Sequence, residues 1–585
     1  MKRIALCAVL ACAITVAAAA ANTDAAGSNS QLVFSTFLGL GEFSPAADFS
    51  DSLERPYFNF ALTPSGAAFV TAAYAGLLPV SSGAFLTSGS GAFASEVDVQ
   101  SAASVQLVES TYLPFRAFPT AVATDAATGF IYVTGVYASV PGSTFPTTPG
   151  AFQAGVAALK SNRYFAFTPF VLVLNPGASG SEQVVYSTLL GGSFDDAPAG
   201  IAADSKGLIF VAGTTSSPDF PITAGAFQSS LKQGAFGNTN AFISVLDPSP
   251  MGPSQLVYST YFGGSGCGLT RGEKVNAMAL GPGDRVYLAG FTNSSDFPVT
   301  VGAPEARIMP GACQPEQPGI AFTGPAFVTV LAPLAQARSQ LLYSTYLAAT
   351  AAPAPVVDAP DRLYSQTWGT AIAVDPAGRA YVTGTTNSPR LPTTKTAFEN
   401  SLPGEEAYSP FVTVLDPAKK GSASLVYSTY LGGTQAGLPG PGFDSGNAIA
   451  VDAKGLVYVT GRTAAVDFPL TKNASQTSLL NDNTLDTPFN AFIAVLRTPV
   501  STAPAPPAIF SPPSSLAYSS YFGGARSVGL GIGVDGRGLV YVSGTATNDA
   551  AMGLPVTAGA VQDTLPSGSN GIGNFLSVLK LPPVG

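Results

Sequence analysis

The stretch NAIAVDAKGLVYVTG, residues 447–461, has the pattern of two short strands joined by a tight turn. Residues 447–452 and 456–461 are mainly apolar, and an Asp-x-x-Gly turn separates them, in which the aspartate accepts hydrogen bonds from turn amides. A third apolar run, NAFIAVL at residues 490–496, follows, and LAYSSYFGG from residue 516 is a fourth. The stretch therefore predicts a unit of four short strands.

The same unit recurs along the whole chain. Hairpins like that of residues 447–461 lie at residues 121–135, 200–213, 276–290, 371–384 and 531–544, with a degraded version at 58–71. A Ser-Thr or Ser-Ser step inside an apolar run recurs seven times, and its first serines are Ser35, Ser110, Ser187, Ser259, Ser344, Ser428 and Ser519. Seven copies at a loose period indicate a repeat array.

The strands are apolar on both faces, which favours a propeller over an open sheet. In the run from residue 425, Leu425, Tyr427 and Leu431 point one way, while Val426 and Tyr430 point the other. Blades stacked around an axis bury both faces, and small residues suit the crowded innermost strand. We expect an all-β fold, a single seven-bladed β-propeller with four-stranded blades, over residues 31–585.

The order of the strands also predicts how the ring closes. Each unit runs hairpin, third strand and outer Ser-Thr strand, but the first run, QLVFSTFL at residues 31–38, is an outer strand with no unit before it. The last unit ends with its third strand, NFLSVLK at residues 574–580. We expect these two segments to pair, because pairing ties the ends of the array and hides a strand edge.

Four motifs in fixed order, LVYSTYLGG, AIAVDxxGxxYVTG, DFPxTxGAFQ and NAFIxVL, resemble the bacterial SBBP repeat, which is named for a predicted seven-bladed β-propeller. The resemblance covers about residues 31–580. The chain departs from the pattern at residues 58–62, which read FNFAL, at Glu109 in place of tyrosine, and at Leu280-Gly281 in place of Val-Asp. The resemblance implies an exported or surface propeller, and it implies no settled biochemical activity.

The N-terminus predicts export. Lys2 and Arg3 precede an apolar stretch at residues 4–21 that ends in Ala-x-Ala steps, so we expect a signal peptide at 1–21 and a short linker at 22–30. An uncleaved membrane anchor and lipidation at Cys12 are the alternatives. The expected location is the periplasm, the cell surface or the medium, without a membrane span after cleavage, and a monomer is expected.

The net charge of -9 and the absence of a Lys/Arg-rich run argue against a nucleic-acid partner. Cys7 and Cys12 leave with the signal peptide. Cys267 and Cys313 remain, in two loops predicted on the same face of one blade, and we expect them to form a disulfide.

The chain has no histidine, which excludes Ser-His-Asp and Cys-His machinery and histidine-bound metals. Five aspartates share one hairpin position and are interpreted as turn residues: Asp125, Asp204, Asp375, Asp452 and Asp535. Asp196 and Asp444 are potential calcium ligands, but structural roles are favoured. No catalytic residue, cofactor or metal site is predicted.

Two further motifs are not interpreted as sites. GIGVDG at residues 531–536 matches G-x-G-x-x-G, but it aligns with the ordinary hairpin of the other blades and no helix follows, so the match is interpreted as coincidence in a Gly-rich chain and a dinucleotide site is not expected. The Phe-Pro-x-Thr-x-Gly-Ala-Phe segment, as at residues 220–227, recurs in every blade and is assigned to packing, with stacking on sugars as the alternative.

These observations favour a non-catalytic propeller that binds or scaffolds a protein or glycan through its long, variable loops. The alternative is a carbohydrate lyase or hydrolase that uses Asp, Tyr or Arg. The candidate ligand-binding residues lie in and beside the loop that leads into the fifth blade: Asp358, Asp361, Arg362, Tyr364 and Trp368. That Trp368 fills a gap between blades is the other interpretation of this residue.

Overall fold

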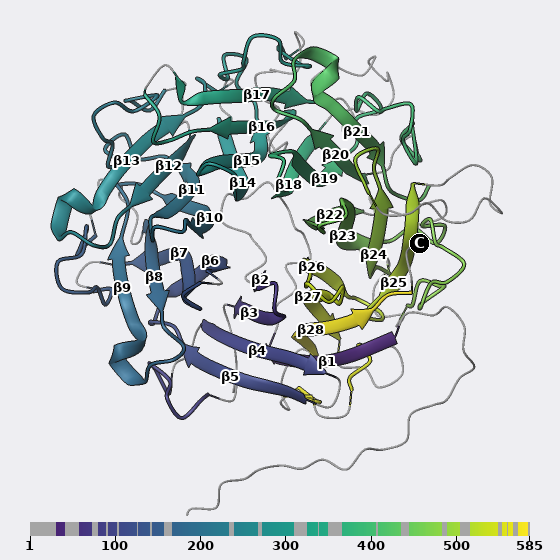
Figure 1. Ribbon diagram of the computed structural model, residues 1–585, viewed down its shortest axis with the longest axis horizontal. Helices are drawn as coiled ribbons and strands as arrows, with labels where there is room; N and C mark the ends of the chain where they lie inside the picture. Colours follow the sequence, from purple (N-terminus) through teal and green to yellow (C-terminus); the bar gives the residue numbers. More distant parts are fainter. Residues whose placement is uncertain are drawn as a thin grey trace, which may run out of the picture.

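The protein is a ring of seven blades around a central opening (Figure 1). The computed structural model describes residues 31–40, 58–72, 80–88, 92–101, 104–125, 127–140, 143–156, 166–232, 239–266, 272–308, 324–336, 339–348, 366–404, 408–434, 444–481, 488–502, 515–547, 553–557, 560–565 and 571–582. In these residues 28 strands form seven antiparallel four-stranded sheets, as the sequence predicts.

Each blade is numbered from its innermost strand outward. The innermost strands of blades 1 to 7 are β2 (Phe58–Leu62), β6 (Ala117–Thr124), β10 (Asp196–Ala203), β14 (Glu273–Gly281), β18 (Thr367–Val374), β22 (Ser445–Val451) and β26 (Val528–Val534). The second strands are β3 (Ala67–Ala72), β7 (Ile131–Ser139), β11 (Ile209–Thr215), β15 (Arg285–Thr292), β19 (Ala380–Thr386), β23 (Leu456–Thr463) and β27 (Val540–Thr547).

The third strands are β4 (Phe93–Ser101), β8 (Ala166–Leu174), β12 (Asn240–Leu246), β16 (Ala326–Leu331), β20 (Ser409–Leu415), β24 (Asn490–Arg497) and β28 (Ile572–Lys580). The outer strands are β5 (Ser104–Tyr112), β9 (Val184–Leu189), β13 (Leu256–Phe262), β17 (Leu341–Leu347), β21 (Leu425–Tyr430), β25 (Leu516–Phe522) and, for blade 7, β1 (Gln31–Leu40). Short 3-10 helices precede three outer strands: η1 (Gly180–Gln183), η2 (Gly252–Gln255) and η5 (Gly421–Ser424).

The ring closes where the two ends of the array meet. Strand β1 pairs antiparallel with β28, with Gln31 opposite Lys580 and Ser35 opposite Ser577. In Figure 1 the purple β1 lies directly beside the yellow β28. This is the pairing that the order of strands in the sequence predicts.

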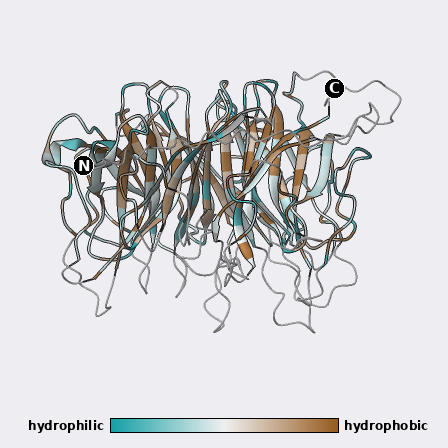
Figure 2. Ribbon diagram, turned by 90° about the horizontal axis from the view of Figure 1, so that it is seen from below, coloured by the Kyte–Doolittle hydropathy of each residue, from teal (hydrophilic) through white to brown (hydrophobic). Residues whose placement is uncertain are grey.

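The core lies between blades rather than inside one sheet. One hydrophobic cluster, for example, joins Val171 of blade 2 to Val211 and Phe242 of blade 3. Seen from the side, the strands carry most of the hydrophobic colour and the loops at both faces most of the hydrophilic colour (Figure 2). Burial on both faces of each sheet explains why the strands do not alternate between apolar and polar residues.

Hydrogen bonds around the central opening link successive blades. In blades 2 to 7 a register shift interrupts the pairing of the innermost strand with the second strand. A polar side chain at this position, or at the matching position of β2, donates to a backbone oxygen of the next blade in five cases: Asn59 to Pro119, Thr120 to Pro198, Asn276 to Gly369, Thr370 to Gly446 and Asn447 to Gly529. The repeat therefore encodes contacts between blades as well as strands.

The strand order gives the ring two unlike faces. Loops from each outer strand to the next innermost strand, here called inter-blade loops, share one face with the loops from second to third strands. We call it the inter-blade face. The turns between first and second strands lie on the opposite face, the hairpin-turn face.

Candidate functional site

The residues proposed from the sequence as ligand-binding fall mostly beyond what the structure describes. Asp358, Asp361, Arg362 and Tyr364 lie outside the described residues, and so do Cys267 and Cys313. Trp368 is the second residue of β18 and is only 6% exposed. Its ring stacks on Tyr408, with centroids 5.9 Å apart and planes 3° apart, and packs with Phe291 of blade 4. This packing agrees with the interpretation that Trp368 fills space between blades.

Buried acids anchor the inter-blade loops that enter blades 3 and 4. The Asp196 carboxylate accepts hydrogen bonds from Thr215 Oγ1 at 2.5 Å, Ser217 Oγ at 2.9 Å and Gly192 N at 2.8 Å. Glu273 accepts from Thr292 Oγ1, Asn240 Nδ2 and Gly264 N, and from Ser294 Oγ. Burial raises the pKa of each acid to about 7, although these donors oppose the rise. The acids hold the Gly-Gly turns that follow the outer strands.

Asp444, the other potential calcium ligand, has the same kind of partners. It accepts hydrogen bonds from Thr463 Oγ1 at 2.9 Å and from Ala464 N at 2.7 Å. Within the part of the chain that the structure describes, no group of three or more His, Cys, Asp or Glu side chains is arranged to hold a metal ion. The geometry assigns Asp196 and Asp444 structural roles at the starts of their blades.

A second aspartate, from the Asp-Phe-Pro motif, clamps three inter-blade loops from the side. Asp219 accepts hydrogen bonds from both the amide and the hydroxyl of Ser193, each at 2.9 Å. Asp296 and Asp467 bind Ser265 and Thr434 through the same two groups. The clamp fixes the base of each loop, so a loop projecting beyond it starts from a rigid position.

The phenylalanines of the Phe-Pro segments are packing residues, as the sequence analysis favours. Phe220 is 3% exposed, and its ring centroid lies 4.5 Å from that of Phe242. Phe145, Phe297 and Phe468 pack in the same way on the third strands of their blades. The Tyr261 hydroxyl donates to Ser217 O at 2.8 Å and accepts from Phe220 N, and burial raises its pKa to about 12. These aromatic side chains are unavailable for stacking on a sugar.

The remainder of this segment covers the edge of the outer strand, a role that the sequence analysis missed. In blade 2, Thr148 N donates to Ser187 O, and Leu189 N donates to Gln153 O. The matching bonds link Thr223 to Ser259, Thr300 to Ser344, Thr394 to Ser428, Thr471 to Ser519 and Thr557 to Ser35, and Ser81 to Ser110 in blade 1. All seven outer strands are therefore shielded from edge-to-edge pairing. The recurrence of Thr and Gln beside the phenylalanines is the signal that marks this role.

The aspartates at the hairpin position are turn residues, as predicted. Asp204 Oδ1 accepts from Lys206 N at 2.8 Å and Leu208 N at 2.9 Å. Asp375, Asp452 and Asp535 bind the corresponding amides, and Asp125 binds Ala127 N.

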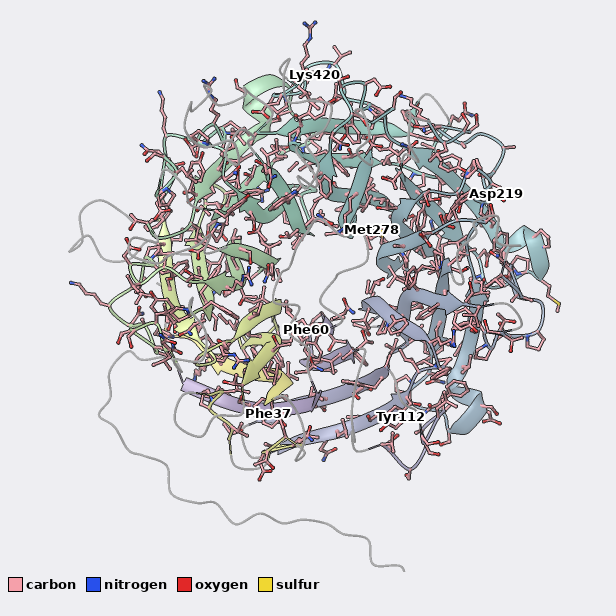
Figure 3. The ribbon with its side chains drawn as sticks, turned by 180° about the vertical axis from the view of Figure 1, so that it is seen from behind. Phe37, Phe60, Tyr112, Asp219, Met278 and Lys420 are labelled. Atoms are coloured by element: carbon pink, nitrogen blue, oxygen red, sulfur yellow. The ribbon has the colours of Figure 1, made fainter. Side chains whose placement is uncertain are left out.

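The glycines of the GIGVDG motif have a packing role. A Cβ at Gly531 would lie 2.7 Å from Phe60 Cβ, and a Cβ at Gly533 would lie 2.9 Å from Leu62 Cδ2. Figure 3 shows Phe60 at the central opening, as it does Met278. The glycines make room for the bulky innermost strand of blade 1, so the motif is more than the coincidence that the sequence analysis assumed, although it does not form a dinucleotide site.

Non-repeating residues remain exposed on the inter-blade face. Phe115, between β5 and β6, is 68% exposed, and the guanidinium of Arg116 lies 5.5 Å from its ring centroid. Arg116 has a φ of 67°, in a region that favours glycine. Val466, between β23 and β24, is 62% exposed. These side chains are presented on clamped or strand-anchored loops.

The fold thus defines a seven-bladed β-propeller. Residues 185–221 and 342–389 match the family model described as SBBP: Beta-propeller repeat. Each matched segment begins in an outer strand and covers the following hairpin; the first reaches Phe220-Pro221, and the second ends just before Leu391-Pro392. The resemblance to the SBBP repeat is confirmed there. No curated protein sequence matches the chain.

Solved structures with a similar arrangement include two polysaccharide lyases and a putative 6-phosphogluconolactonase from Bacteroides uniformis. One polysaccharide lyase is 10% identical, with a TM-score of 0.37 and coverage of 95% of this chain and 99% of the lyase. The other, an ulvan lyase, is 8% identical, with a TM-score of 0.39 and coverage of 92% and 94%. The phosphogluconolactonase is 9% identical, with a TM-score of 0.34 and coverage of 84% and 97%. These likenesses are too low to transfer any property to this chain.

Proposed function

We propose that this chain is an exported, non-catalytic β-propeller that binds a protein or a glycan at the cell exterior through its inter-blade face. The observation that carries the proposal is the contrast between repeating and non-repeating residues. The recurring Asp, Thr, Tyr and Gln side chains form hydrogen bonds within the ring, in the loop clamps, the hairpin turns and the segments that cover the strand edges. The residues that differ from blade to blade lie in loops. Loops on a rigid scaffold are where binding residues concentrate.

Export is part of the proposal and rests on the N-terminal sequence. The basic residues and the apolar stretch of residues 1–21 are typical of a cleaved signal peptide. No helix within the described ranges is long and apolar enough to cross a bilayer. N-terminal sequencing of the mature protein tests this part: a start near residue 22 supports it, and an intact Met1 in a membrane fraction overturns it.

The binding role is tested on a glycan array, and by cross-linking on the surface of the producing cell, with the purified mature protein. Phe115→Ala removes the most exposed aromatic side chain among the described residues of the inter-blade face, and Leu334→Ala is the control, since Leu334 is 46% exposed in the loop between β16 and β17 on the opposite face. Reduced binding of the Phe115 variant alone supports the proposal. Equal loss in both variants overturns the assignment to this face. Cleavage of a bound glycan favours the lyase or hydrolase alternative.

A further inference from the structure

A tight turn between blades 1 and 2 presents an aromatic ring and a cation side by side. Phe115 and Arg116 are its two central residues, and the turn closes where Ala117 N donates to Pro114 O at 3.0 Å. Arg116 O accepts a hydrogen bond from Ala138 N of β7 at 3.0 Å, which fixes the turn to blade 2. The Phe115 side chain is 68% exposed, and the guanidinium carbon of Arg116 lies 5.5 Å from its ring centroid. The pair is therefore presented from a fixed backbone, so binding would order little more of the chain.

The backbone of Arg116 is strained. Its φ is 67°, in the left-handed region that glycine adopts without a steric penalty. Glycine occupies most of the positive-φ positions of the described residues. Such strain at a residue other than glycine concentrates at functional sites, where a particular side chain is required. An arginine at this position therefore indicates a role for the guanidinium that glycine could not fill.

The Arg116 guanidinium has no anionic partner in the ring. Arg116 is the only lysine or arginine among the described residues from 58 to 190, which form blades 1 and 2. No ion pair joins it to a carboxylate of the described residues. The net charge of the chain is -9, so this cation does not belong to a basic surface that would attract any polyanion. A single guanidinium without an internal partner is suited to bind one carboxylate or similar anionic group, through two parallel hydrogen bonds.

The surroundings of the turn favour a glycan over a protein as the partner. A stable protein interface buries about 800 Å² on each side, around a core of contiguous apolar side chains. Among the described residues, the large apolar side chains exposed on the inter-blade face are those of Phe115 and Val466, with blades 7 and 1 between them. A sugar residue needs less, namely one aromatic ring for its apolar face and one cation for an acidic substituent. Phe115 and Arg116 supply these two groups.

We propose that Phe115 and Arg116 bind one acidic sugar residue of a glycan. This inference narrows the ligand class of the function proposed above and rests on that function. The apolar face of the sugar ring packs on the exposed ring of Phe115, and its carboxylate or sulfate accepts hydrogen bonds from the guanidinium of Arg116. A neutral sugar keeps only the first of these contacts, so the pair selects acidic sugars.

The test measures, by calorimetry, the affinity of the mature protein for two acidic probes and their neutral counterparts. Oligogalacturonate is compared with its methyl ester, and dextran sulfate with dextran. The wild type should bind at least one acidic probe about tenfold or more tightly than its neutral counterpart, and the better acidic probe distinguishes carboxylate from sulfate. Equal affinity for the charged and neutral forms, or no binding to either acidic probe, would overturn the inference.

Three variants assign the binding to this turn. Arg116→Gly should lower the affinity for the acidic probe about 10- to 100-fold, without lowering the melting temperature, because glycine adopts the positive φ without strain. Phe115→Ala should weaken binding of the charged and neutral forms alike. Arg390→Gln removes an exposed arginine of the same face in blade 5 and should bind as the wild type does. Unchanged affinity in Arg116→Gly, or an equal loss in Arg390→Gln, overturns the inference, whereas binding of a neutral glycan or a cross-linked protein instead would overturn it and leave the function proposed above in place.

Discussion

A disulfide across the closure measures how much the β1–β28 pairing contributes to stability. Ser35 and Ser577 are cross-strand partners, and their hydroxyl oxygens lie 2.8 Å apart in a buried contact. Replacing both by cysteine places two sulfur atoms within bonding reach without moving the strands. Ser244 and Ser259 in blade 3 form the same kind of pair at 2.9 Å and are the matched control.

The two pairs differ in the length of chain between them, 542 residues for the closure and 15 for the control. A cross-link lowers the entropy of the unfolded chain more when it closes a longer loop. The chain-entropy relation gives about 6 kcal/mol for the closure and about 3 kcal/mol for the control. The difference of about 3 kcal/mol is expected if unfolding of the ring separates β1 from β28.

The assay is chemical denaturation of each double variant with and without reductant, after mass spectrometry has confirmed the bond. The gain in the free energy of unfolding on oxidation should be larger for the closure pair. The reasoning is refuted if the Ser35→Cys/Ser577→Cys bond does not form in the folded protein. It is equally refuted if the bond stabilises no more than the control bond does.

Three further predictions concern the packing of a glycine, the buried acids and a turn aspartate. Gly531→Ala should lower the free energy of unfolding by about 1–3 kcal/mol in denaturant titrations because its Cβ would meet both Ser543 Oγ and Phe60 Cβ, and an unchanged free energy would contradict the packing role of this glycine. Asp196 and Glu273 have folded pKa values of about 7, above those of the unfolded chain, so stability should fall as pH rises from about 4 to about 7 and then level off. Melting temperatures across this range should flatten in Asp196→Asn and Glu273→Gln, and an unchanged slope would contradict the assignment. Asp375→Ala should cost about 2–5 kcal/mol, because the 4%-exposed carboxylate serves two turn amides and an arginine, whereas the matching change at the half-buried Asp125, which binds one turn amide, should cost less.

Much of the fold was predictable because the residues that define it repeat. The Ser-Thr steps mark the outer strands, and the Asp-x-x-Gly turns mark the hairpins. Their partners are local or lie at a fixed distance along the repeat, as with Asp204 and Leu208. The cover over the strand edge was not predicted, because Thr148 binds Ser187, 39 residues away, on a strand edge that only the folded blade creates.

The sequence predicted which face of the ring carries the candidate site, but not the residues that form it. Loops that differ between blades cannot be compared with a matching loop elsewhere in the chain. Four of the candidate residues also lie outside the described residues: Asp358, Asp361, Arg362 and Tyr364. The exposed Phe115 carried no signal in the sequence, because its Pro-Phe-Arg segment stands where blades 2, 3, 5 and 6 have a Gly-Gly turn. Phe115 is a candidate binding residue because its side chain is exposed, and that exposure depends on where the strands of blades 1 and 2 end.

The innermost strands show how a ring of similar blades fixes the order of its neighbours. In the repeat, the isoleucine of one blade packs against two alanines of the blade before it, as Ile449 does against Ala371 and Ala373. Two innermost strands carry a larger residue at the isoleucine position, Phe60 in blade 1 and Met278 in blade 4. The blade before each has glycine in place of alanine, at Gly531 and Gly200.

An added Cβ at Gly531 would approach Phe60 Cβ to 2.7 Å, and one at Gly200 would approach Met278 Cβ to 2.5 Å. The inner strand of blade 1 therefore fits against the glycines of blade 7, where an alanine would force a neighbouring atom to shift. Repeat proteins misassemble when units dock on the wrong neighbour, and steric mismatch is a general way to prevent it. The contact of Phe60 with Gly531 thus joins blades 7 and 1 at the inner strands, and the β1–β28 pairing completes blade 7 with the first strand of the array at the outer edge.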